Sequence, residues 1–307
     1  MIGGGMNASL SPMFLTDLAA VHATLRPSPL SAAFLSDLKK VYATLPTASD
    51  DNLRFLANRF DEWRRVTREW VRARVKKLDK DDPLLCQISL FRTMDSGRLE
   101  TAHTRTLAWL LDPKNKEHGF GDVLLSALLG RLADRDHFDH LHVESVASEY
   151  LLEGSAGKGR LDVLAKGEWE SMGERVRWML VIEAKVDAWE GEGQLDKYDE
   201  WLDLHAADRV PYRVFLTPEG RPPETGAEEW EAMSFLELVR IFRAVYGGLR
   251  HAPGFHFLRF YLAGVLQDVC GLPRHVGEDA ADPYAVASYL KAVHDSHSEG
   301  ASHDAAR

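Results

Sequence analysis

The chain has 307 residues, a formal net charge of −10 and a hydrophobic content of 45%. This length and apolar content allow one large α/β domain with appendages, or two small domains. The acidic balance argues against a protein that coats nucleic acid nonspecifically, because neutralising phosphates needs clustered Lys and Arg. A local basic groove can still exist on an acidic protein.

The two cysteines and the apolar runs argue against a disulfide-rich, zinc-binding or membrane-spanning protein. Cys86 and Cys270 lack metal-ligand spacing, so neither a disulfide scaffold nor a zinc site is indicated. No apolar run reaches the length of a membrane span, and no basic start with a hydrophobic core opens the chain. We therefore expect a cytoplasmic protein with no membrane partner.

The N-terminal region contains a repeat. The segment LSPMFLTDLAAVHATLRP at 10–27 is echoed by LSAAFLSDLKKVYATLPT at 30–47, an offset of 20 residues. Two copies are too few for a solenoid. The repeat predicts paired amphipathic helices within a helical N-terminal extension over residues 1–90, which would serve as an accessory element or join two chains in a homodimer.

A basic segment follows at 61–80, with Trp63, Val66, Trp70 and Val71 on its apolar side. A basic helical face with tryptophans could bind backbone phosphates or a partner, and the alternative is an ordinary solvated helix. Its basic residues are Arg64, Arg65, Arg68, Arg72, Arg74, Lys76 and Lys77.

The next predicted helix, at 98–111, carries polar residues on its apolar face. Glu100 and His103 extend the stripe formed by the leucines of the helix at i, i+3, i+7 spacing. Both can be explained without function, since Glu100 would be favoured by the helix dipole and His103 could be a satisfied core histidine. A second helix is expected at 121–133.

Three strands then follow, at 143–153, 161–166 and 178–185, and the last two carry charged residues. Strand side chains alternate faces, so Glu183 and Lys185 point the same way, with Cα atoms about 7 Å apart. If the second and third strands pair, Asp162 adds a second carboxylate. The alternative is an ordinary surface Glu/Lys pair, but the apolar residues before Glu183 indicate a core strand, and open α/β folds place their ligands at such strand ends.

These residue types suit hydrolysis of a phosphodiester. Mg²⁺ and Mn²⁺ prefer carboxylates, carbonyls and water, and Asp162 and Glu183 can supply the carboxylates. A lysine beside the metal can orient the attacking water or stabilise the developing charge, which fits Lys185. The pattern predicts a divalent-metal phosphodiesterase site.

The remainder of the chain continues an α/β pattern. A helix at 193–206 places Gln194 and Tyr198 on one face at i, i+4 spacing; Tyr198 could equally be a core aromatic. A strand at 212–217 and helices at 234–247 and 253–270 follow, and the chain then turns polar.

The motifs resemble those of the PD-(D/E)XK nuclease superfamily, specifically its bacterial branch with an LAWLLDP-type helix, here residues 107–113. Gly159-Arg160-Leu161-Asp162 is similar to the first acidic motif and Ile182-Glu183-Ala184-Lys185 to the second. The run 194–198 looks like the Q-x-x-x-Y element found after the lysine in several of these nucleases. The resemblance covers about 180 residues.

The resemblance implies an α/β fold: a restriction-endonuclease-like αβββαβ core with a mixed central sheet flanked by helices. We expect this core and its C-terminal helices at 91–272, after the N-terminal extension and before a polar, flexible tail at 273–307. The resemblance also implies a nuclease that depends on Mg²⁺ or Mn²⁺, acts on DNA rather than RNA, and has a role in defence against foreign DNA.

The resemblance further assigns roles to the candidate residues. Asp162 and Glu183 would hold the metal with the carbonyl of Ala184 and Glu100, and Lys185 would orient water. Gln194 would complete the catalytic set, and His103, Tyr198 and Arg160 would contact substrate. One alternative is a catalytically silent nuclease fold that binds nucleic acid or assembles with proteins. Another is an interaction protein that works through its helical extension.

Overall fold

The computed structural model describes residues 50–135, 137–152, 159–171, 173–226, 228–276, 283 and 286–291. The predicted repeat at 10–47 lies outside these residues. The chain divides into two compact units, residues 1–66 and 67–307. Helix α3 (Asp50–Val75) confirms a helix over most of the basic segment. Val71 near its C-terminal end is buried in the core of the second unit, so that unit begins before the expected boundary at residue 91.

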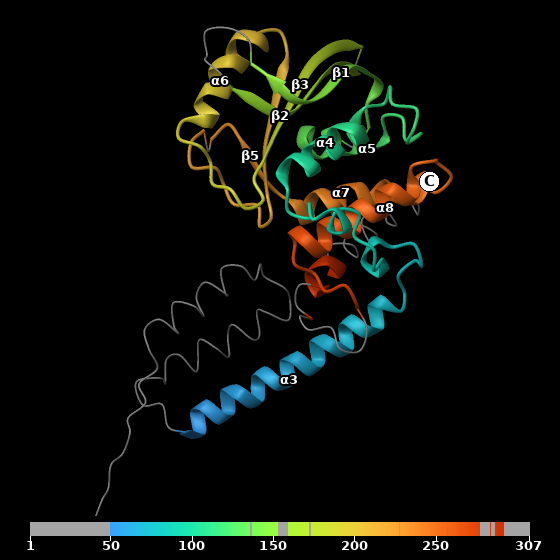
Figure 1. Ribbon diagram of the computed structural model, residues 1–307, viewed down its shortest axis with the longest axis vertical. Helices are drawn as coiled ribbons and strands as arrows, with labels where there is room; N and C mark the ends of the chain where they lie inside the picture. Colours follow the sequence, from blue (N-terminus) through green and yellow to red (C-terminus); the bar gives the residue numbers. More distant parts are fainter. Residues whose placement is uncertain are drawn as a thin grey trace, which may run out of the picture. The chain divides into compact units, whose positions relative to one another are not determined.

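The second unit is built on a five-stranded mixed sheet of order β1-β2-β3-β4-β5 (Figure 1). The first three strands are antiparallel and the last three are parallel. Parallel neighbours need a crossover, which α6 supplies between β3 and β4. The strands are β1 (Asp139–Leu151), β2 (Arg160–Ser171), β3 (Glu174–Ala184), β4 (Val210–Thr217) and β5 (Glu231–Ser234).

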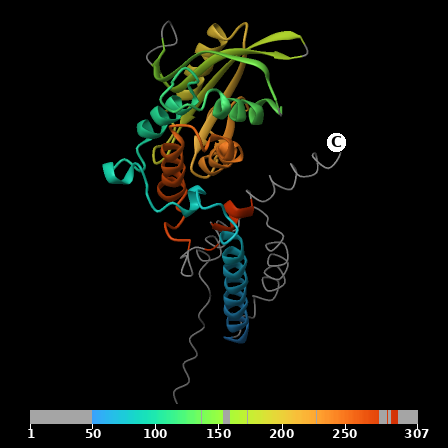
Figure 2. The same ribbon diagram turned by 90° about the vertical axis from the view of Figure 1, so that its right-hand side faces the viewer.

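Helices cover both faces of the sheet, as expected for the predicted α/β class. Helix α6 packs on one face, and α4 and α5 pack on the other. Helices α7 and α8 lie beside α4 and α5 and complete that layer (Figures 1 and 2). The helices are α4 (Glu100–Leu111), α5 (Val123–Ala133), α6 (Gln194–His205), α7 (Phe235–Tyr246) and α8 (Phe255–Gly264), which continues into a π-helical turn (Val265–Val269); short 3₁₀ turns occupy Pro83–Leu85, Arg92–Met94 and Gly247–Leu249.

The central strand β3 is apolar on both faces and divides the core into two clusters. Leu180 and Ile182 join the cluster under α4, α5, α7 and α8. Met179 and Val181 join the cluster that contains Leu195 and other residues of α6. Because side chains alternate along a strand, Glu183 continues the series that faces α6.

The C-terminal region differs from the expected polar tail. Residues 286–291 are helical, and Val286, Tyr289 and Leu290 are buried in the core of the second unit. The Tyr289 hydroxyl donates to Asp82 Oδ1 at 2.9 Å. The spacing i, i+3, i+4 places the three apolar side chains on one helical face, so the tail prediction was wrong for this stretch. Residues 292–307 lie outside the described part of the chain.

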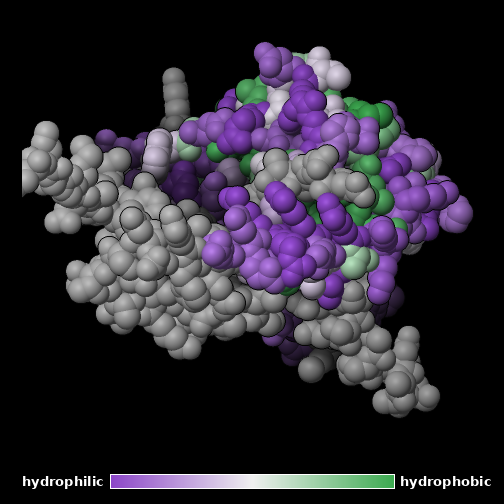
Figure 3. Space-filling view, turned by 90° about the horizontal axis from the view of Figure 1, so that it is seen from below, coloured by the Kyte–Doolittle hydropathy of each residue, from purple (hydrophilic) through white to green (hydrophobic). Residues whose placement is uncertain are grey.

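The face of the molecule seen in Figure 3 is mostly hydrophilic where it is described, with hydrophobic residues in small separate patches. No helix among the described residues is long and apolar enough to cross a membrane.

Candidate active site

Two carboxylates lie side by side at the end of the β2–β3 ladder. Val163 pairs with Ile182 in this antiparallel ladder, so the preceding Asp162 and the following Glu183 are the next neighbours. Asp162 Oδ2 accepts a hydrogen bond from the backbone N–H of Ala184 at 2.9 Å. Both carboxylates are buried. The antiparallel register therefore brings together the acids of the two predicted motifs.

Two cationic or polar donors converge on one oxygen of Glu183. Lys185 Nζ donates to Glu183 Oε1 at 2.6 Å, and Gln194 Nε2 donates to the same oxygen at 2.6 Å. The backbone N–H of Lys185 donates to the Leu216 carbonyl at 2.9 Å, which continues the parallel pairing of β3 with β4. The lysine is thus held at the strand end, on the same face as Glu183.

The other oxygen of Glu183 has no partner. Oε2 makes no hydrogen bond, and the residue is only 1% exposed. Buried polar atoms without a partner are rare in folded proteins. A carboxylate with one oxygen fixed by two donors and one left open has the arrangement of a ligand that awaits a cation.

Burial dominates the electrostatics of this cluster. It raises the pKa of Glu183 to about 8, with a further rise from the neighbouring Asp162. Burial also raises the pKa of Asp162 above its usual range, against the hydrogen bond from Ala184. For Lys185, burial alone would lower the pKa, but the charge and hydrogen bond of Glu183 outweigh it and the pKa is raised. The lysine is therefore an ammonium at neutral pH.

The first residue of α6 is oriented by a complete set of hydrogen bonds. Gln194 Oε1 accepts from the Gly191 N–H at 3.1 Å, and Nε2 also donates to the Tyr198 hydroxyl at 2.7 Å. Gly193 precedes the helix at φ +59°, where a side chain would be strained. The Tyr198 ring is buried, as the core-aromatic alternative expected, and its hydroxyl donates to the Arg160 carbonyl at 2.7 Å. Tyr198 therefore fixes Gln194 and strand β2 together.

Glu100, the first residue of α4, binds the segment that follows Lys185. Its Oε1 accepts from the backbone N–H groups of Val186 at 2.8 Å and Ala188 at 3.3 Å. The structure thus brings Glu100 to the edge of the site, where one of its oxygens orders the backbone after the lysine. A direct bond from Glu100 to a metal stays a prediction.

His103 lies in the aromatic core. It is 1% exposed, and its ring packs edge-on against Phe91 and Phe235 at 5.1 and 5.7 Å between centroids. Its Nε2 bonds to the Gly97 carbonyl at 2.9 Å, and burial lowers its pKa. This packing matches the core-histidine alternative, so we assign no substrate contact to His103.

Arg160 is half exposed at the start of β2. Its guanidinium pairs with Glu149 at 2.8 Å, and Glu149 also pairs with Arg105 of α4. Two guanidinium groups therefore flank the site on the side of β1 and α4. A contact between Arg160 and substrate remains a prediction.

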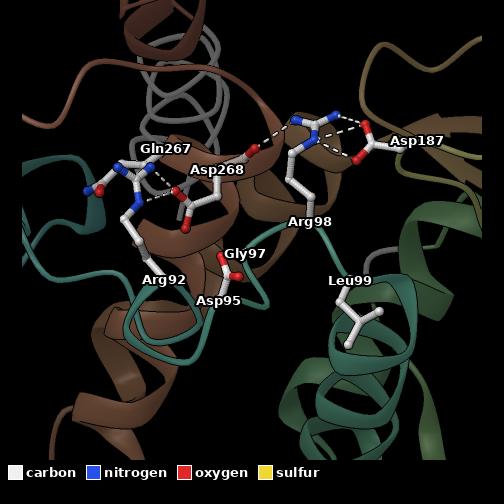
Figure 4. Close-up of a pocket in the computed structure, with 8 residues that line it drawn as sticks. All are labelled: Arg92, Asp95, Gly97, Arg98, Leu99, Asp187, Gln267 and Asp268. Carbon is white, nitrogen blue, oxygen red and sulfur yellow. Dashed lines mark hydrogen bonds and ion pairs between the residues drawn. The ribbon is translucent and has the colours of Figure 1, made fainter.

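A pocket of about 560 Å³ lies beside the segment that leads into α4 (Figure 4). Figure 4 shows Arg98 between Asp187 and the backbone of Asp268. Arg98 Nε donates to both carboxylate oxygens of Asp187 at 2.9 Å, and Nη1 donates to the Asp268 carbonyl at 2.8 Å. The sequence pattern did not indicate the pair of Arg98 and Asp187. Arg98 lies two positions before Glu100, and Asp187 lies two positions after Lys185.

A comparison with models of protein families shows which family this chain belongs to. A family model described as the PD-(D/E)XK nuclease superfamily matches residues 89–259, more than half of the chain. The chain belongs to the PD-(D/E)XK nuclease superfamily. No curated protein and no solved structure matched it. The family match covers α4, the sheet and the Asp162, Glu183 and Lys185 cluster, so the family's matched region contains the site described above.

The residues of this PD-(D/E)XK site fit a divalent cation. The unpartnered Glu183 Oε2 and the adjacent Asp162 provide hard oxygen donors. Among the described residues, no group of three or more His, Cys, Asp or Glu side chains forms a metal cluster. Mg²⁺ commonly uses one or two protein carboxylates and keeps several waters, so two carboxylates are an adequate set.

Proposed function

We propose that this PD-(D/E)XK protein hydrolyses phosphodiester bonds of nucleic acid, with DNA as the substrate and Mg²⁺ or Mn²⁺ as the cofactor. The observation that carries the proposal is the Glu183 carboxylate, buried beside Asp162 with one oxygen unpartnered and the other bound to Lys185. Burial of an acidic group without a partner lowers the stability of the fold. A bound cation would supply the missing partner. The choice of DNA over RNA, like a role in defence, is supported only by the family resemblance.

Asp162 and Glu183 would hold the cation, joined by the Ala184 carbonyl and Glu100. A bound divalent cation would lower the pKa of a water molecule and offset charge that develops on the phosphate. Lys185, held as an ammonium by Glu183, would orient the attacking water and stabilise that charge through its remaining donors.

Gln194 acts on Glu183 through the hydrogen bond to Oε1. This bond fixes one oxygen and so directs the unpartnered oxygen toward the cation position. The Tyr198 hydroxyl accepts a second hydrogen bond from Gln194 Nε2, which holds the amide in place. Gln194 is a positioning residue in this scheme, and it can also approach the substrate backbone from the N-terminus of α6.

The proposal is tested with the purified full-length chain and labelled single- and double-stranded DNA and RNA, each in Mg²⁺, Mn²⁺ or EDTA. We expect cation-dependent cleavage of DNA that is lost in Glu183→Gln. Cleavage of RNA alone would correct the substrate and keep the reaction. Binding of cation and nucleic acid without any cleavage would favour a catalytically silent module. A cytoplasmic location and a homodimer through the N-terminal extension remain predictions.

A further inference from the structure

Trp189 stands out in the segment between the two halves of the site. Of the eight tryptophans in the sequence, all of which lie in described residues, it is the only one that is exposed. Its exposure of 74% is also higher than that of the other exposed large apolar side chains, such as Leu151 and Leu204. A single exposed apolar residue is common on protein surfaces, so its surroundings must decide whether it has a role.

The backbone on both sides of Trp189 is fixed. On one side, Ala188 donates its N–H to Glu100 and its carbonyl accepts from Arg221 Nη2 at 3.2 Å. On the other side, the Glu190 carboxylate accepts from the backbone N–H groups of Glu224 at 2.7 Å and Thr225 at 3.2 Å. The loop therefore holds the tryptophan in a defined place, although the indole itself stays in solvent.

One face of the indole carries a cation. The Arg221 guanidinium carbon lies 4.9 Å from the centroid of the Trp189 ring, and 5.7 Å from that of the buried Phe215. The backbone N–H of Arg221 donates to Thr217 Oγ1 at 2.9 Å, which ties it to the end of β4. A guanidinium over an indole face is favourable, and here it orients the ring.

The position along the chain limits the distance between Trp189 and the candidate site. Trp189 follows Lys185 by four residues, so the two Cα atoms are at most about 14 Å apart. It precedes Gln194 by five residues, and the side chains of Lys185 and Gln194 meet on one oxygen of Glu183. At about 3.4 Å per stacked nucleotide, the span between the Cα atoms of Lys185 and Trp189 is at most about four nucleotides, so one short strand can reach both residues.

We propose that Trp189, oriented by Arg221, is a stacking platform for an unpaired base of the substrate strand within a few nucleotides of the cleaved phosphate. The inference rests on the proposed function and narrows its substrate to nucleic acid with a single-stranded segment at the site. An exposed, oriented indole suits this task because every base offers a π-face, and stacking needs no fixed sequence. A base inside a duplex has both faces covered by its neighbours and gains nothing from the platform.

The test measures the affinity of the full-length chain for a fluorescein-labelled 15-nucleotide oligothymidylate by fluorescence anisotropy, in EDTA so that no cleavage occurs. Loss of one base–aromatic stack typically weakens binding about 5- to 150-fold. We expect Trp189→Ala to fall in that range, and Trp189→Phe to stay within about threefold of the wild type because it keeps an aromatic face. Leu204→Ala, at a side chain 65% exposed on α6, is the matched control and should bind as the wild type does. A blunt 15-base-pair duplex should bind Trp189→Ala and the wild type equally.

Three results would overturn the inference: wild-type affinity in Trp189→Ala, an equal loss for the duplex, or no binding of the oligothymidylate by the wild-type chain. Circular dichroism of each variant verifies the fold. The outcome is separable from that of the proposed function. Cation-dependent cleavage with no effect of the Trp189 substitution would support the proposed nuclease function and reject the stacking role. Trp189-dependent binding without cleavage would support the stacking role and reject the nuclease function.

Discussion

Two groups of charged residues near the end of β3 contain carboxyl groups whose pKa values shift in opposite directions. In the buried group, the pKa of Asp162 and of Glu183 is raised, first by burial. In the exposed group, the hydrogen bond from Arg98 lowers the pKa of Asp187, and the same bond raises the pKa of Arg98. Both groups pair carboxylates with a cation, so the difference comes from burial and not from residue type.

The difference in burial distinguishes a structural ion pair from a candidate ligand site. Both oxygens of Asp187 accept from Arg98, and both partners are largely exposed. Such a pair contributes little stability and is screened by salt. Neither carboxylate oxygen of Asp187 is left without a hydrogen bond. The buried group has one cation for two carboxylates and leaves Glu183 Oε2 unpartnered. Only the buried group therefore leaves a carboxylate oxygen open for a further ligand.

The largest expected effect is the loss of function on neutralising either buried carboxylate. Asp162→Asn and Glu183→Gln keep the side-chain shape but remove a hard-oxygen charge from the cation site. We expect Mn²⁺ binding by calorimetry to be lost, and cleavage to fall at least about a thousandfold. Asp187→Asn makes the same carboxylate-to-amide change in the exposed group and should alter cleavage less than about threefold. Unchanged Mn²⁺ affinity in both buried variants would show that Asp162 and Glu183 do not hold the cation.

Next in size is the effect of Lys185→Ala. Loss of one electrostatic donor at a reacting phosphate typically costs about 3 kcal/mol, or roughly a hundredfold in rate. We expect Mn²⁺ binding to persist, since no ligand is removed, while single-turnover cleavage slows by that factor. A wild-type rate at saturating metal would show that Lys185 only pairs with Glu183.

A smaller effect is expected at the N-terminus of α6. In a Gln194→Ala, Tyr198→Phe double variant, Glu183 loses one of its two donors and the link to β2 is broken. We expect Mn²⁺ to bind and cleavage to slow about tenfold, because small displacements of reacting groups are costly. Normal turnover with an intact circular dichroism spectrum would reduce both residues to a packing role.

The smallest expected effect concerns stability without a cation. The folded-state pKa of Glu183, about 8, exceeds the usual value of 4.5, so the folded chain holds a proton that the unfolded chain releases. This contribution to stability is present below about pH 4.5 and is lost as the pH rises toward 8. In EDTA near pH 8, Glu183→Gln should therefore be more stable than the wild type by about 2 kcal/mol, roughly 4–8 °C in Tm.

The difference in Tm between Glu183→Gln and the wild type should shrink as the pH falls to about 4.5, where the wild-type carboxyl is protonated in both states. Thermal unfolding in EDTA across this range measures it. An advantage that is the same at every pH would mean that the substitution acts through packing and not through charge.

Much of the fold and the charged pattern of the site could be predicted from sequence. Alternation along β3 placed Glu183 and Lys185 on one face, and the i, i+4 spacing placed Gln194 beside Tyr198. These are local properties, because the periods of a strand and a helix decide them within a few residues. The predicted order of elements likewise agreed with the αβββαβ core that the family resemblance implied.

Tertiary packing decided the features that depend on distant neighbours. His103 has the same helical spacing as a site residue, but the rings of Phe91 and Phe235 enclose it. Glu100 meets the N–H groups of Val186 and Ala188, 86 and 88 residues away. Local periodicity assigns a residue to a face of its own element, whereas burial and hydrogen-bond partners depend on which other elements cover that face. For that reason the sequence by itself determined the charged pattern of the candidate site. Only the folded chain decided which polar residues are core, which hold the loop after Lys185, and that Trp189 is left exposed in that loop.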